Sequence, residues 1–205
     1  MPEIKPRFEF RTFTNNVGIV EEKMRKLSKV ENIRESSEIY IMSSENNENN
    51  AKIRDNLMDI KVFVKEEKGL EQWNPRMKGS FPMKSSKIES EVFSAFGVKL
   101  PEFKRDEYTL EQFLNEIVNV HNDLTAVKVF KRRFAFTINN CIAEIGEVYI
   151  NGALIRTANI ESVNINDILE AKKMVSLDEY DNINYLMAIK RVIGMEPLPD
   201  NFYLK

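Results

Sequence analysis

The chain has little of several features that would narrow its function at once. Among 205 residues it has one cysteine, Cys141, and one histidine, His121. A single cysteine excludes an intramolecular disulfide framework and fits a reducing compartment. A single histidine excludes a histidine-rich zinc site. No Gly-x-x-x-x-Gly-Lys or Gly-x-Gly-x-x-Gly element occurs, so neither a P-loop nor a Rossmann phosphate site is indicated.

Long apolar runs and an excess of one charge are also missing. No stretch approaches the roughly 18 apolar residues that a membrane span requires, and the first residues do not resemble a secretory signal. We therefore expect a cytoplasmic protein with no membrane partner. Lysine and arginine total 30 against 32 acids, whereas proteins that coat long nucleic acids usually carry a basic excess. We expect no long duplex nucleic acid as partner, so any anion site must be local.

The pattern of elements predicts an α+β protein. At 205 residues, 42% of them hydrophobic, the chain suits one domain over 1–205. Short alternating segments are separated by turn signals such as Asp55-Asn56, Asn139-Asn140 and Asn151-Gly152, which is typical of antiparallel hairpins. Because a parallel sheet needs a helix between nearly every pair of strands, we favour an antiparallel fold, of which a closed barrel is one form.

Helical signals lie between and after these strands. We expect helices over 17–29, from Ser85 or Ser86 to about Phe96, from Thr109 to about 122, from Asn166 or Asp167 to about 175, and over about 180–193. Thr109 and Gln112 form the pattern of a capping box, and Gly97 and Gly194 stand where helices should end. The segment 69–82, with glycines and prolines around Trp73, reads as irregular or as an edge strand.

Cationic side chains recur at every second position of several predicted strands. Side chains at i and i+2 of a strand point to the same face, so each segment aims two charges in one direction. If those faces converge, they form a pocket for a polyanion, and arginine adds bidentate geometry for phosphate. If they do not converge, they are ordinary solvated sheet faces. The basic candidates are Arg11, Lys52, Arg54, Lys61, Lys131 and Arg133.

The order of these charged strands resembles the CYTH domains of the triphosphate tunnel metalloenzymes. The resemblance runs from Arg7 to Tyr185 and rests on Arg7-Phe8-Glu9-Phe10-Arg11, Lys52-Ile53-Arg54, Ile60-Lys61, Lys131-Arg132-Arg133 and two strands with Glu144 and Glu161. It implies an antiparallel eight-stranded β-barrel with helices packed outside. It also implies hydrolysis of a triphosphate, which is a nucleoside triphosphate, inorganic triphosphate or an RNA 5′-triphosphate, with Mg²⁺ or Mn²⁺.

The resemblance also implies roles for single residues. Glu9, Glu144 and Glu161 would be metal ligands, Glu9 and Arg133 catalytic, and the six basic candidates would contact the phosphates of a small phosphorylated ligand. Two departures matter, because Arg7 and Asn159 stand where the family has carboxylates. The alternative is therefore a binding module that keeps the cations but has lost full metal ligation and turns nothing over.

Three other residues have a structural and a chemical interpretation. His121 could donate or accept a proton, but we favour a cap or surface residue. Cys141 could be a nucleophile, but we favour a small apolar residue because no histidine partner is in view. Trp73 is more simply an anchor under a loop than a base-stacking platform.

Overall fold

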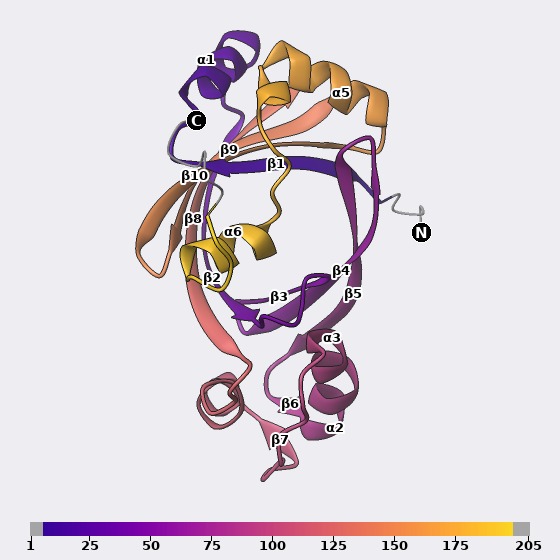
Figure 1. Ribbon diagram of the computed structural model, residues 1–205, viewed down its shortest axis with the longest axis vertical. Helices are drawn as coiled ribbons and strands as arrows, with labels where there is room; N and C mark the ends of the chain where they lie inside the picture. The colour runs from indigo at the N-terminus through magenta and orange to yellow at the C-terminus, as the bar shows by residue number, and fades with distance from the viewer. Residues whose placement is uncertain (1–5, 199–205) are drawn as a thin grey trace. The chain divides into compact units, whose positions relative to one another are not determined.

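A computed structural model describes residues 6–198 of the chain. Within these residues, eight strands pair in the order β1-β10-β9-β8-β2-β3-β4-β5 and close into a barrel (Figure 1). The predicted antiparallel eight-stranded barrel is confirmed. The barrel strands are β1 (Phe8–Thr14), β2 (Asn32–Met42), β3 (Asn49–Arg54), β4 (Leu57–Glu67), β5 (Leu70–Ser80), β8 (Thr125–Ile138), β9 (Cys141–Ile150) and β10 (Ala153–Ser162). Two short strands, β6 (Met83–Lys84) and β7 (Glu107–Tyr108), form a separate two-stranded sheet.

The helices follow their local signals closely. Thr109 and Gln112 make both hydrogen bonds of the capping box, and Gly97 ends a helix in the left-handed conformation at φ 70°. The helical segments are α1 (Gly18–Leu27), α2 (Ser85–Lys87), η1 (Ile88–Phe93), α3 (Ser94–Phe96), α4 (Leu110–Gln112), η2 (Phe113–Val118), α5 (Ile165–Met174), η3 (Leu177–Glu179) and α6 (Tyr185–Val192). None of these helices is long and apolar enough to cross a membrane.

The hairpin turns also obey local chemistry. Asp55 and Asn56 both have positive φ, 50° and 61°, as a two-residue turn between twisted strands requires. Asn151 and Gly152 have φ of 47° and 91° for the same reason.

Several elements differ from the sequence expectation, and the helices expected to end at 29 and about 122 end at Leu27 and Val118. Asn164, not Asn166 or Asp167, caps α5, because its side chain accepts a hydrogen bond from the backbone N–H of Asn166. The last helix begins at Tyr185, since Asn184 caps it. The segment around Trp73 is a full barrel strand, β5, because Phe8 and Glu9 of β1 pair with Gln72 and Glu71.

The chain divides into two compact units, each with its own core. Unit one comprises residues 1–36, 64–73 and 130–205, and unit two comprises 37–63 and 74–129. Strands β2, β4, β5 and β8 have residues in both units. The single domain over 1–205 stays a prediction.

In unit one, the apolar face of the sheet packs against α1 and α5. Phe10 and Ile160 on the strands, Val20 on α1 and Ala171 on α5 belong to one buried cluster. Burying a side chain the size of Phe contributes about 1.5–3 kcal/mol. Alternation along the strands then turns Glu9 and Arg11 to the opposite face, which α6 approaches (Figure 1). We call this opposite side the charged face of unit one.

Unit two repeats this arrangement. Ile53 and Ile60, which alternate with polar neighbours on β3 and β4, pack in one cluster with Val92 and Phe96. The other face of these strands carries Lys52 and Asp59, which lie directly opposite each other. The hydrophobic alternation of the strands therefore determines which side chains lie on the face away from the core, where a binding site can form.

Candidate functional site

Arg11 is the centre of the charged face of unit one. Its side chain is 9% exposed, and its Nε donates a 2.6 Å hydrogen bond to Oε1 of Glu9. Its Nη1 lies 3.7 Å from Oε1 of Glu144 and donates to Oγ1 of Thr157 at 3.4 Å. Burial disfavours the charged form of Arg11 and by itself would lower its pKa. The nearby carboxylates of Glu9 and Glu144 favour the charged form more strongly, so the pKa of the guanidinium is raised. Arg11 is therefore a permanent, enclosed cation.

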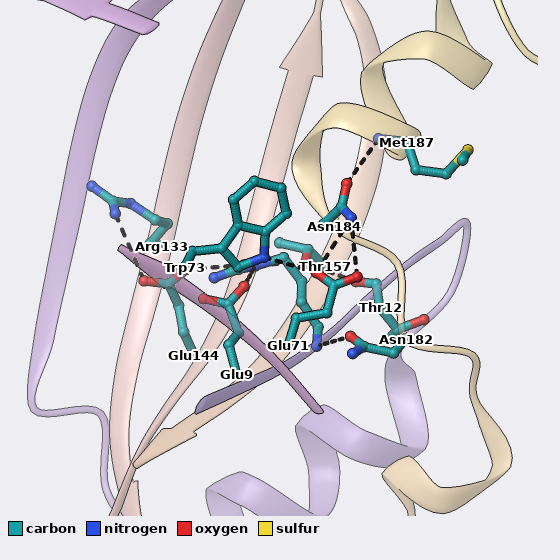
Figure 2. A network of polar contacts seen from close by, with 11 residues as sticks. Glu9, Thr12, Glu71, Trp73, Arg133, Glu144, Thr157, Asn182, Asn184 and Met187 are labelled. Atoms are coloured by element: carbon teal, nitrogen blue, oxygen red, sulfur yellow. Dashed lines mark hydrogen bonds and ion pairs between the residues drawn. The ribbon is translucent and has the colours of Figure 1, made fainter. Parts of the chain in front are cut away.

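Glu144 is shared between two arginines. While its Oε1 lies near Arg11, its Oε2 lies 3.9 Å from Nη1 of Arg133 (Figure 2). Arg133 also donates from Nη2 to Oγ of Ser36 at 3.4 Å, but its buried Nε has no hydrogen-bond partner among the described residues. A buried donor without an acceptor costs about 1–3 kcal/mol, so Arg133 has capacity for one more oxygen.

Lys131 lies two residues before Arg133 and is 3% exposed. Its Nζ stands 3.8 Å from the ring centroid of Tyr185, the first residue of α6. The guanidinium carbon of Arg11 lies 4.9 Å from the same ring. A desolvated cation over an aromatic face is held by about 2 kcal/mol or more. One tyrosine therefore touches two of the predicted phosphate-binding cations.

Gly146 makes room for this packing. It lies opposite Thr157 across β9 and β10, and a Cβ at this position would meet Cγ2 of Thr157 at 2.9 Å and Cγ of Arg133 at 3.6 Å. A larger residue would therefore displace the methyl group of Thr157, whereas 3.6 Å from Arg133 is an ordinary van der Waals contact.

The predicted metal ligands lie on the same face but are bound to arginines. Glu9 pairs with Arg11 and Glu144 with Arg11 and Arg133, while Glu161 lies 3.4 Å from Nη1 of Arg7. Within residues 6–198, no three acidic, histidine or cysteine side chains are grouped so that they hold a metal ion. As they lie, the three glutamates do not fit a divalent ion.

The other basic candidates belong to unit two. Glu38, whose side chain is 1% exposed, lies 4.0 Å from Nζ of Lys52 and 3.6 Å from Nη1 of Arg54, while Lys61 is exposed. Burial lowers the pKa of Lys52, although Glu38 and Asp59 act in the opposite direction. The predicted convergence of Lys52, Arg54 and Lys61 with the cations of unit one stays a prediction.

A polar network missed by the sequence analysis joins β5 to α6. Glu71 accepts a 2.9 Å hydrogen bond from Nε1 of Trp73 and bonds of 3.1 and 3.2 Å from Nδ2 of Asn184 (Figure 2). Burial raises the pKa of Glu71, and Glu9, its cross-strand neighbour, adds to the effect. The sequence signal for this network was the spacing of two residues between Glu71 and Trp73. In a strand this spacing points both side chains to the same face, but the segment first had to be recognised as a strand.

His121 and Cys141 have structural roles. Nδ1 of His121 accepts from the backbone N–H of Asp123 at 3.1 Å, and Nε2 lies 2.7 Å from the carbonyl oxygen of Lys99. Cys141 is buried in the core of unit one, and burial raises the pKa of its thiol to about 11, which makes it a poor nucleophile at neutral pH.

Comparisons with known proteins identify the fold. No model of a protein family and no curated protein sequence matches the chain. Among solved structures, a putative adenylyl cyclase from Hippeastrum, described as having a dominant triphosphatase activity, aligns over 94% of this chain and 98% of its own. It has a TM-score of 0.51 and 10% identity. A conserved hypothetical protein from Pyrococcus furiosus aligns over 88% and 98%, with a TM-score of 0.50 and 13% identity. The resemblance to the triphosphate tunnel proteins is thus confirmed at the level of the fold.

Proposed function

We propose that this protein binds a triphosphate, or a similar short polyphosphate, on the charged face of unit one. The observation that carries the proposal is the buried Nε of Arg133, a cationic donor for which residues 6–198 provide no acceptor, on the same face as the enclosed cations Arg11 and Lys131. A phosphate oxygen is the acceptor that suits it best, because arginine binds phosphate through two parallel N–H groups.

The surroundings of the three cations suit an anion that binds reversibly. Glu9 and Glu144 are acceptors for Arg11 and Arg133 when no ligand is bound, so the cations do not stand buried and uncompensated. Contacts of 3.7 and 3.9 Å between Glu144 and the two guanidinium groups are longer than good hydrogen bonds, so a phosphate oxygen can compete for these cations. The shared fold with a protein described as having a dominant triphosphatase activity supports a triphosphate as the ligand.

Two activities remain for such a site. The first is hydrolysis of the bound triphosphate with Mg²⁺ or Mn²⁺, with Glu9, Glu144 and Glu161 as ligands. It requires these carboxylates to leave their arginines, and Arg7 adds a further cation beside Glu161. The second is binding without turnover, and the ion pairs favour it because each predicted ligand already has a cationic partner.

The proposal is tested by titrating tripolyphosphate into the protein by calorimetry, once with EDTA and once with Mg²⁺ or Mn²⁺, while released phosphate is measured. We expect saturable binding in EDTA. Binding in EDTA without phosphate release in either metal supports the binding module, whereas metal-dependent release supports the hydrolase. No binding and no release under any condition overturns the proposal.

Substitutions of three neighbouring basic residues on β8 test where the ligand binds. Lys131→Ala and Arg133→Ala should each weaken binding by roughly tenfold or more, since charge-assisted hydrogen bonds contribute about 1.5–3 kcal/mol. Arg132→Ala serves as the control, because Arg132 points to the other face and lies 3.5 Å from Glu35. Equal losses for all three variants would indicate only a long-range charge effect.

A further inference from the structure

The segment before α6 completes one edge of β1. Within residues 6–198, strand β5 pairs with β1 at Phe8 and Glu9. Two residues further on, the backbone N–H of Arg11 donates to Oδ1 of Asn182 at 2.9 Å, and its carbonyl accepts from the N–H of Ile183 at 2.6 Å. The chain leading into α6 is thereby fixed to the residue that carries the central guanidinium.

Glu71 holds the start of α6 itself. Oδ1 of Asn184 accepts from the backbone N–H of Met187, which makes Asn184 the N-cap, and its Nδ2 is directed to the carboxylate of Glu71 (Figure 2). The indole of Trp73 donates to the same carboxylate. The oxygen of the Asn184 amide accepts the capping hydrogen bond and its nitrogen donates to Glu71, so these two contacts together fix the orientation of the side chain.

Tyr185 follows Asn184 directly and carries this connection to the cations. Its ring packs edge-on against Phe13 at 4.9 Å and faces Nζ of Lys131 and the guanidinium of Arg11. A rotation of the first turn of α6 would therefore move the surface against which both cations rest.

We propose that Glu71 is a positioning residue for polyphosphate binding: through Asn184 it fixes the first turn of α6, and Tyr185 then holds Arg11 and Lys131 in place for phosphate oxygens. The inference rests on the proposed function and adds three residues to its site. Cations whose orientation is set beforehand bind with a smaller loss of side-chain entropy.

The sign of one substitution separates positioning from simple electrostatics. Glu71 is an acid near an anion site, so by charge alone Glu71→Gln should strengthen binding of tripolyphosphate. If Glu71 acts through Asn184, the substitution weakens binding. Nδ2 of Asn184 lies 3.1 and 3.2 Å from the two carboxylate oxygens of Glu71, so in either amide orientation the NH₂ group of glutamine would face this donor where an oxygen now accepts.

The experiment is calorimetric titration of tripolyphosphate in EDTA with the full chain. We expect Glu71→Gln to weaken binding by about fivefold or more. Glu67→Gln, which changes an exposed acid that pairs with Lys65, should stay within about twofold. In a Tyr185→Ala background, which should itself bind less tightly, Glu71→Gln should cause no further loss. The fluorescence of Trp73, the only tryptophan, should change in Glu71→Gln and confirm that the connection is broken.

Asn184→Ser is the second variant, because serine keeps the N-cap but does not reach Glu71; it should reproduce the loss seen with Glu71→Gln. Tighter or unchanged binding in Glu71→Gln, or an equal further loss in the Tyr185→Ala background, overturns the inference while the proposed function stands. If the wild-type chain binds no polyphosphate, the proposed function falls and the inference falls with it. If Glu71→Gln does not fold, Asn184→Ser alone decides between the same outcomes.

Discussion

Arg11 donates a 2.6 Å hydrogen bond from Nε to Oε1 of Glu9, two residues earlier on the same strand. The residue predicted to contact phosphate and the residue predicted to ligate metal are therefore bound to each other. Each satisfies part of the other's charge without ligand or metal, so a phosphate or a metal ion has to compete with this pair. This relationship leads to the first prediction.

Arg11→Met should destabilise the fold. The substitution leaves Glu9 and Glu144, 30% and 18% exposed, beside an apolar side chain, and we expect a loss of about 2–4 kcal/mol in the free energy of unfolding. Urea unfolding measures it. The control is Lys26→Met, which breaks an exposed pair with Glu22 on α1 and should cost far less. Similar losses in both variants would contradict the role of Arg11 as an enclosed cation.

Glu144→Gln should have opposite effects on the two candidate activities. If the protein only binds, removing this carboxylate releases Arg11 and Arg133, and the affinity for tripolyphosphate should rise by about fivefold. If it hydrolyses triphosphate with metal, the same substitution should remove phosphate release. Calorimetry and a phosphate assay are run side by side. Glu147→Gln is the control, since Glu147 lies three residues on, on the other face, and pairs with Arg156.

Glu38→Gln should destabilise unit two in a pH-dependent way. Lys52 would lose a carboxylate 4.0 Å away while Arg54 and Lys61 continue to disfavour its charge, so its lowered pKa should fall further. A base whose pKa is lower in the folded state costs stability below that pKa. The cost disappears as pH rises toward the unfolded value of about 10.4.

We therefore expect Glu38→Gln to be less stable than wild type by about 2 kcal/mol at pH 7, with a smaller difference at pH 10. Thermal unfolding at both pH values measures this change. A difference that is constant with pH would mean that Lys52 does not carry the effect.

Cys141 should be nearly inert in the native protein. With a pKa of about 11, its thiol ionises little at pH 8, and alkylation by iodoacetamide should be roughly a hundredfold or more slower than in the unfolded chain. Mass spectrometry of timed reactions in buffer and in guanidinium follows the rate. Rapid labelling of the folded protein would show that the core of unit one opens readily at β9.

Local patterns accounted for much of the fold. The alternation of Phe8 and Phe10 with Glu9 and Arg11, the turn at Asn151-Gly152 and the capping box at Thr109 each depend on neighbours within a few residues, and the structure confirms all three. Phe13 departs from this alternation, because its ring packs against Tyr185 on the charged face. Strand β5 was not recognised as a barrel strand, because a Gly- and Pro-punctuated segment becomes regular only through hydrogen bonds to a distant partner.

The sequence alone determined which side chains share a face, because period 2 follows from the geometry of a single strand. It thus determined that Glu9 and Arg11 lie together, and likewise Lys131 and Arg133. Only the tertiary structure decided what those faces meet. Glu71 and Asn184 are 113 residues apart, and the arrival of Tyr185 between Arg11 and Lys131 depends on α6 packing against β1. Long-range packing, which no local pattern encodes, determined which partner each of the predicted charged residues contacts.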